Sequence, residues 1–314
     1  MFPHIVRRLI YLVLVLFIMS AIVFFLMNIV TGDPVVIMLG QSATQETITK
    51  LREQLGLNRP VIVQYLDWIS HVIRGDLGDS YTLPMTVSEV ILQRFPVTIE
   101  LTLLSMIFSL IIAIPLGIFA AIKFNSKTDI TLMGFSAACI SMPNFWIGIL
   151  LILLFSLKLN LLPASGYVPF LTSPLKNLRL MILPVVTLSI WYIAVYMRFT
   201  RSTFIETLRS DYILVARAKG MQERRVLWVH AFKNTLIPLV TVVGVNISGL
   251  FGGAVVTETV FSLPGLGRLL VDAILGKDLP LIEGIVLFIT TAVILCNLVV
   301  DILYVTIDPK IRYD

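Results

Sequence analysis

Long apolar stretches alternate with shorter polar segments along the chain. Six of these stretches carry few charges: residues 9–30, 97–122, 130–157, 181–197, 236–261 and 282–307. A helix of about 20 mainly apolar residues crosses the hydrocarbon core of a bilayer, which is about 30 Å thick. Pro115 and Pro143 lie inside two of the stretches, and we expect them to bend their helices. The pattern predicts an all-α, polytopic membrane protein with six transmembrane helices.

The stretches divide the chain into parts. Residues 1–30 hold the first helix, whose apolar core exceeds the roughly 7–15 residues of a cleaved signal peptide, so we expect it to be retained. Residues 31–96 carry charges of both signs and short amphipathic segments. They are predicted to form a small extracytoplasmic helical domain between helices 1 and 2. Residues 97–307 form the core with helices 2–6 and a polar loop at 198–235, and residues 308–314 form a tail.

Composition supports the membrane interpretation. Of 314 residues, 57% are hydrophobic and 14% are charged, and the mean hydropathy is +0.94. A soluble domain carries roughly 25% charged residues, which excludes a soluble globular protein. Lys and Arg concentrate at the N-terminus, the turn at 123–129, the 198–235 loop and the tail. Because cytoplasmic loops are rich in Lys and Arg, both termini are predicted to be cytoplasmic, and the net charge of +5 gives no reason to expect nucleic-acid binding.

Several kinds of chemistry are not expected. Cys139 and Cys296 lie in apolar stretches and predict no disulfide, and the three histidines, His4, His71 and His230, lack the spacing of metal ligands. The G-x-x-x-x-G-K-[ST] phosphate loop is absent from the sequence. We therefore expect no catalytic residue, no metal site and no ATP-binding site in this chain.

The 198–235 loop carries the clearest functional pattern. Phe204, Leu208, Tyr212 and Val215 recur at helical spacing, which predicts an amphipathic helix that Gly220 closes. A second short helix at 222–232 and Pro238, in the first turn of the fifth span, are expected to follow. Such a helix could rest on lipid headgroups, or it could be a docking site for a cytoplasmic partner.

Residues 211–220, Asp-Tyr-Ile-Leu-Val-Ala-Arg-Ala-Lys-Gly, resemble the coupling segment, or EAA loop, of ABC importer permeases, and in particular the dipeptide/oligopeptide/nickel permease family. Of the general Glu-Ala-Ala pattern only Ala216 and Gly220 match, a departure that the peptide subfamily shares. Six more segments resemble the family in order along essentially the whole chain: Thr31-Gly32-Asp33-Pro34, residues 54–60, 75–78, 141–146, 258–267 and 308–312.

The resemblance implies a type I ABC importer permease fold and a set of residues that contact an ATPase: Tyr212, Ala216, Arg217, Ala218, Lys219 and Gly220. Gly220 would allow a sharp turn, and Ala216 and Ala218 would allow close approach. The basic side chains Arg217, Lys219, Arg224 and Arg225 would either contact the ATPase or be the solvated flank that any cytoplasmic loop carries.

The resemblance also implies partners. These are a second, homologous permease subunit, two ATP-binding subunits that carry ATP and Mg²⁺, an extracytoplasmic solute-binding protein and membrane lipid, with no nucleic acid. The expected location is the bacterial cytoplasmic (inner) membrane. The cargo would be a di- or oligopeptide, and nickel or a nickel chelate is the alternative within the same family.

Polar and small residues inside the spans have two interpretations each. Glu100, Asn246, Asn297 and Asp301 could be hydrated near the interface, or they could pack between helices and line a pathway. The glycines of the fifth span, Gly244, Gly249, Gly252 and Gly253, could allow close helix packing or line a pore.

Two other functions fit a polytopic membrane protein. A secondary transporter driven by an ion gradient would favour an internal repeat, and the two halves of this sequence show no convincing one. A membrane scaffold that moves no cargo is the other alternative.

Overall fold

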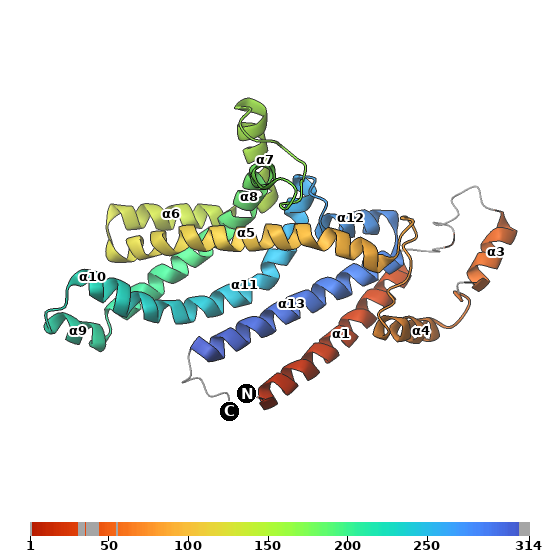
Figure 1. Ribbon diagram of the computed structural model, residues 1–314, viewed down its shortest axis with the longest axis horizontal. Helices are drawn as coiled ribbons and strands as arrows, with labels where there is room; N and C mark the ends of the chain where they lie inside the picture. Colours follow the sequence, from red (N-terminus) through yellow and green to blue (C-terminus); the bar gives the residue numbers. More distant parts are fainter. Residues whose placement is uncertain (1, 31–34, 36–43, 55, 308–314) are drawn as a thin grey trace. The chain divides into compact units, whose positions relative to one another are not determined.

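The computed structural model describes residues 2–30, 35, 44–54 and 56–307 (Figure 1). The segments 31–34 and 308–312, and Leu55 of the segment 54–60, lie outside these residues. The chain forms two compact units, one from Met1–Pro96 and Pro264–Ile294 and the other from Val97–Leu263 and Leu295–Asp314. Each unit is described separately.

Apolar helices dominate the described part of the chain. Five are long and apolar enough to cross a membrane, and a bent pair can supply a sixth span. The five are Ile10–Ile29, Val87–Ile122, Pro174–Leu208, Glu223–Val260 and Leu279–Val300. The prediction of a polytopic, all-helical membrane protein is confirmed.

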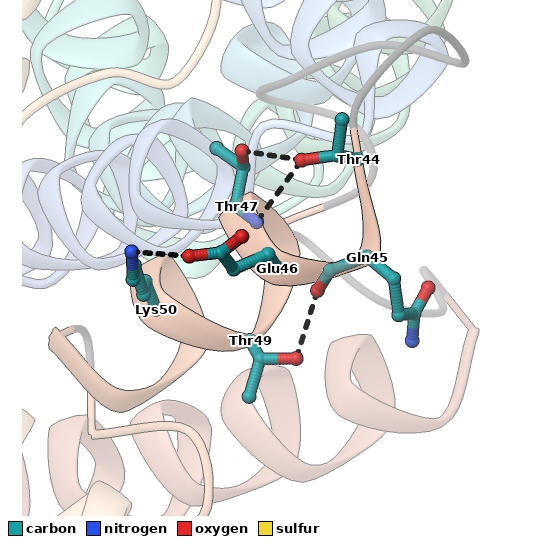
Figure 2. Close-up of polar contacts among 6 residues, drawn as sticks. All are labelled: Thr44, Gln45, Glu46, Thr47, Thr49 and Lys50. Carbon is teal, nitrogen blue, oxygen red and sulfur yellow. Dashed lines mark hydrogen bonds and ion pairs between the residues drawn. The ribbon is translucent and has the colours of Figure 1, made fainter.

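The first unit begins with α1 (Phe2–Val30) and the short polar helix α3 (Gln45–Gln54). Thr44 precedes α3, and its Oγ1 accepts a hydrogen bond from the backbone N–H of Thr47 at 3.4 Å (Figure 2). Glu46 pairs with Lys50 one turn later at 2.6 Å. Both side chains are exposed, so this pair contributes only about 0.3–0.5 kcal/mol, and α3 depends mainly on its cap and sequence propensity.

Helix α4 (Val61–Ile73) packs against α1. Tyr65 of α4 is buried, and its hydroxyl lies 2.8 Å from Oγ of Ser20 in α1. The ring of Phe24 lies 5.6 Å from that of Trp68, centroid to centroid. The apolar face of α4 therefore attaches the 61–73 segment to the first spanning helix.

The core of this unit joins the start of α5 (Val87–Ile122) to α12 (Leu266–Gly276) and the start of α13 (Leu279–Ile307). No pattern in the sequence predicted α12. Asp278, in the turn between α12 and α13, is fully buried and accepts hydrogen bonds from Ser80 Oγ at 2.5 Å and from Thr82 N and Oγ1 at 2.9 and 2.8 Å. This carboxylate ties residues 80–82 to the start of the last helix.

The second unit is built around α8 (Pro174–Leu208). Helix α8 packs against α6 (Lys127–Ser141), α7 (Asn144–Leu151) and α11 (Phe232–Val260). Its buried residues include Leu188, Tyr192, Tyr196 and Met197. Gly117 of α5 faces Thr200 and the carbonyl of Met197, where an added Cβ would come within 2.8 Å. Close backbone approach between α5 and α8 therefore requires glycine there.

The third predicted span, 130–157, is not one straight helix. It divides into α6 and a second segment that comprises α7 and a π-helical stretch, η1 (Ile152–Lys158), and the two segments meet at 102°. Met142 and Pro143 separate them with ψ angles of 131° and 137°. A residue before proline is driven out of the helical region, so the effect of Pro143 is confirmed and amounts to a break. Pro115, by contrast, lies within the continuous helix α5.

The prediction of a single amphipathic helix from Phe204 to the turn at Gly220 is wrong. Helix α8 continues to Leu208, and a separate helix, α9, spans Asp211–Ala218. Ser210 divides them because its backbone is extended, at φ −72° and ψ 149°. Phe204 therefore belongs to the end of a spanning helix, and α9 is a short element of its own.

The separate short helix expected at 222–232 is also wrong. Residues Glu223–Val260 form one continuous run made of α10 (Glu223–Arg225), the π-helical η2 (Val226–Ala231) and α11. Pro238 lies inside α11 and not in its first turn. The wide π turn upstream allows the entry into the fifth span to change pitch without a break.

Candidate functional site

Helix α9 stands on a small apolar cluster. Ile213 and Ala216 are its buried residues, and they meet the ends of α5 and α8 and the start of η2. The other buried members of this cluster are Ile118, Ala121, Phe204, Val226 and Ala231. Because one cluster includes residues of α5, α8, α9 and η2, α9 is packed against the ends of two spanning helices and cannot move far without them.

Gly220 closes α9 in a Schellman motif. Its φ is +75°, and its N–H donates to the carbonyl of Arg217 at 2.9 Å, while the N–H of Met221 donates to the carbonyl of Ala216 at 3.3 Å. A Cβ at this position would meet no heavy atom within 4 Å. The prediction of a left-handed glycine at the helix end is confirmed. Glycine is favoured at this position because of its positive φ, since there is room for a larger side chain.

The outer side of α9 carries apolar side chains in the open. Tyr212, Leu214 and Val215 are exposed, as are Trp228 and Val229 of η2. The hydroxyl of Tyr212 accepts a hydrogen bond from Nδ2 of Asn234 at 2.7 Å, which fastens α9 to the first turn of α11. A patch of this kind on an otherwise polar loop is typical of a surface that another protein covers.

Charged residues around α9 have different surroundings. Arg217 forms a bidentate pair with Glu223, with Nε–Oε2 and Nη2–Oε1 distances of 3.1 and 2.5 Å. The hydrogen bond to Glu223 raises the pKa of Arg217, so the guanidinium stays charged. Arg217 is thus engaged within the loop, whereas Ala218 and Lys219 are exposed on the helix end.

A buried ion pair joins α8 to α6. No pattern in the sequence indicated it. Arg201 of α8 donates from Nε and Nη2 to the two oxygens of Asp129 in α6, at 2.5 and 2.7 Å. The Asp129 side chain is 3% exposed and that of Arg201 is 21% exposed. The guanidinium groups of Arg201 and Arg209 both lie over the ring of Phe124, with their Cζ atoms 5.4 and 5.3 Å from its centroid. The turn between α5 and α6 is thereby fixed to α8 a few residues before α9.

The polar residues proposed for a pathway have local hydrogen-bond partners where the structure describes their side chains. Glu100 accepts a hydrogen bond from the hydroxyl of Tyr167 at 2.7 Å, and burial together with this bond raises the pKa of Tyr167. Asn246 donates to its own helix at the carbonyl of Val242. Asn297 reaches Oγ of Ser248 at 3.4 Å.

Asp301 lies in α13, but its side chain is outside the described residues. The other proposed residues have local partners, and a role in a pathway stays a prediction.

The glycines of the fifth span fall into two kinds. A Cβ at Gly249 would lie 2.9 Å from the Tyr192 hydroxyl oxygen, and one at Gly253 would lie 2.8 Å from Cδ1 of Leu188. A Cβ at Gly244 would overlap Val300 of α13. Gly252 has nothing within 4 Å. Close packing accounts for the first three and not for Gly252.

Glu258 in α11 is another buried acid without a predicted role. It is fully buried and accepts a hydrogen bond from Thr98 Oγ1 at 2.6 Å. Its place inside the apolar stretch 236–261 was visible in the sequence, but its partner is 160 residues away. Within the described ranges, no group of three or more His, Cys, Asp or Glu side chains could hold a metal ion.

Known proteins are similar to this chain in sequence and in fold. The family described as "Binding-protein-dependent transport system inner membrane component" matches residues 113–313, and its N-terminal companion family matches residues 1–102. The dipeptide transport system permease protein DppB of Escherichia coli (strain K12) is 41% identical over 318 residues, with 94% of each chain covered. A peptide transport system permease relative from Brucella abortus (strain 2308) is 43% identical over 310 residues, with 99% of each chain covered.

A solved structure shares the architecture. A chain of the inward-facing MetNI methionine ABC transporter matches with a TM-score of 0.59 and 15% identity, over 70% of this chain and 96% of that one. At this identity the likeness concerns the fold alone. It agrees with a type I ABC importer permease architecture.

Proposed function

Because the chain belongs to the family of binding-protein-dependent transport system inner membrane components, we propose that it moves di- or oligopeptides across the bacterial cytoplasmic membrane as one permease subunit of an ATP-driven importer. Membership makes it a multi-pass ABC importer permease, a transport subunit and not an enzyme. The names of its relatives support peptides over nickel as cargo.

The observation that carries the energy-coupling part of the proposal is the construction of α9. Ile213 and Ala216 on its inner side pack against α5, α8 and η2. Leu214 and Val215 on its outer side are exposed. A short helix held in this way transmits a push as a rigid body. We propose that an ATP-hydrolysing subunit covers the open side of α9, with the helix on the cytoplasmic face.

The remaining partners follow from the family and are part of the same proposal. A second, homologous permease subunit would complete the pathway, and two ATP-binding subunits would hold ATP and Mg²⁺. An extracytoplasmic protein would deliver the peptide. Both chain termini would lie in the cytoplasm, as the distribution of Lys and Arg predicts.

Reconstitution tests the proposal. The complete complex in proteoliposomes should accumulate a labelled dipeptide only when ATP is supplied, and uptake should persist after ionophores have dissipated proton and sodium gradients. Uptake that stops with the ionophores and continues without ATP would show an ion-gradient-driven transporter instead. A complex with all subunits that moves no peptide, nickel salt or nickel chelate would refute transport altogether.

A further inference from the structure

A cleft of about 630 Å³ opens within the unit formed by residues 1–96 and 264–294. Its walls come from α4, from residues 76–81 and from the C-terminal part of α1. The start of α13 contributes Leu279, Pro280 and Glu283. The volume lies in the range of about 300–1,000 Å³ that is usual for small-molecule sites.

Glu283 lines this cleft, and the residue is 4% exposed. No described residue forms a hydrogen bond or ion pair with its carboxyl group. Asp278, five residues earlier, is also buried, but Ser80, Thr82 and the N–H of Leu281 all donate to it. The Glu283 carboxyl group therefore lines the cleft without a donor from the described residues. Because acidic groups of largely buried residues usually have partners, a ligand in the cleft would supply the missing donor.

Aromatic rings lie along the same cleft. Phe24, Trp68 and Tyr81 all line it, and Phe24 and Trp68 are neighbours whose ring planes are tilted by 33°. Burial, and then the charges of Glu283 and Asp278, raise the pKa of Tyr81 to about 12. Asp278 and Glu283 thus place two acidic groups near Tyr81, and aromatic faces attract cations.

The rest of the lining favours a cation with N–H donors over a metal ion. Asp67, Asp76 and Asp79 add carboxylates, against the guanidiniums of Arg52 and Arg59. A metal ion needs several ligands from the protein, and the part of the chain that the structure describes holds no such group of side chains. One carboxylate beside aromatic rings suits an ammonium group, which donates three hydrogen bonds.

We propose that this cleft binds a primary ammonium group, with Glu283 as its acceptor and Trp68 beside it. The group could be the amino terminus of a small peptide or the side chain of a lysine on an extracytoplasmic protein. Only the choice between these two sources rests on the proposed function, because binding of the group itself follows from the cleft.

The direct test uses the purified full-length chain in nanodiscs and n-butylammonium as the probe, followed by calorimetry. The wild-type chain should bind it saturably, and Glu283→Gln should weaken binding by about tenfold or more, because the acceptor keeps an oxygen but loses the negative charge that pairs with the ammonium group. Glu53→Gln, an exposed acid on α3 outside the cleft, should bind as the wild type does. Trp68→Leu supplies a second variant and should weaken binding by about threefold or more.

Absence of saturable binding to the wild-type chain would overturn the proposal. So would equal binding by the wild-type chain and Glu283→Gln. If Glu283→Gln fails to fold in a thermal-unfolding control, the Trp68→Leu result decides, and unchanged binding by that variant would also overturn the proposal.

Two further probes identify the source of the group. Competition by dialanine, and none by N-acetyl-dialanine, would support a peptide amino terminus. Competition by Nα-acetyl-lysine amide alone would support a lysine side chain, and failure of both to compete would overturn the ammonium site. ATP-driven uptake is measured separately, so that lost uptake with intact probe binding counts against the proposed function and not against the cleft.

Discussion

Gly220 allows the geometry of the α9 turn to be tested by a single methyl group. Gly220→Ala places a Cβ on a residue with φ +75°, where it would meet no heavy atom within 4 Å. The cost is therefore confined to the backbone, at about 1–2 kcal/mol for an L-residue in the left-handed region. Such a cost lowers the population of the native turn by a factor of roughly 5–30 relative to its competitors.

The assay is ATP-driven dipeptide uptake by the reconstituted complex, compared across a series at position 220. Asn tolerates the left-handed region and β-branched residues tolerate it least, so uptake should fall in the order Gly, Asn, Ala, Val. Gly134→Ala on α6 is the matched control, because a Cβ there also meets nothing within 4 Å and its φ is not positive. Full uptake by the Ala and Val variants, or an equal loss in Gly134→Ala, would show that uptake does not depend on the left-handed backbone at Gly220.

Three further substitutions test packing in the second unit. Asp129→Asn removes one charge from the buried pair with Arg201 and should lower stability by about 3 kcal/mol, measured as thermal unfolding in detergent; an unchanged midpoint would contradict the importance of the pair. Gly244→Ala should destabilise by about 1–3 kcal/mol through overpacking against α13, whereas Gly252→Ala should be neutral in the same measurement, and equal effects would contradict the helix contact. Glu258→Gln keeps an acceptor for its threonine partner and should be better tolerated than Glu258→Ala by about 1–3 kcal/mol, so equal stabilities would argue against that hydrogen bond.

The spanning helices could be predicted because hydropathy over about 20 residues reports burial in lipid directly. What escaped prediction depends on single backbone residues. Ser210 interrupts a helical periodicity that continues from Phe204 to Val215, and only its ψ of 149° reveals the interruption. The π turn at Val226–Ala231 keeps the chain helical where a break was expected. Helix α12 is too short to register as a span.

Parts of the candidate site could likewise be predicted from local sequence, whereas other parts depend on tertiary packing. Gly220 was predictable because a glycine after a helical run favours the left-handed region, and its φ confirms it. The Arg217–Glu223 pair depends on how that turn folds back, and Asp129 and Arg201 are 72 residues apart. Pairings of this kind come from tertiary packing, which one sequence does not encode as a local pattern.

Site-specific photo-crosslinking from α9 in the assembled transporter tests most directly whether an ATP-hydrolysing subunit covers this helix. A photoreactive amino acid at Leu214, which is exposed on the open side of α9, should crosslink to the ATP-hydrolysing subunit. The same group at Ile62, which is exposed on α4, should not. A cysteine at the same position, Leu214→Cys, should be protected from a membrane-impermeant maleimide added outside intact cells. Labelling of that cysteine from outside, or crosslinking of position 214 to lipid alone in the complete complex, would contradict a cytoplasmic α9 covered by the ATP-hydrolysing subunit.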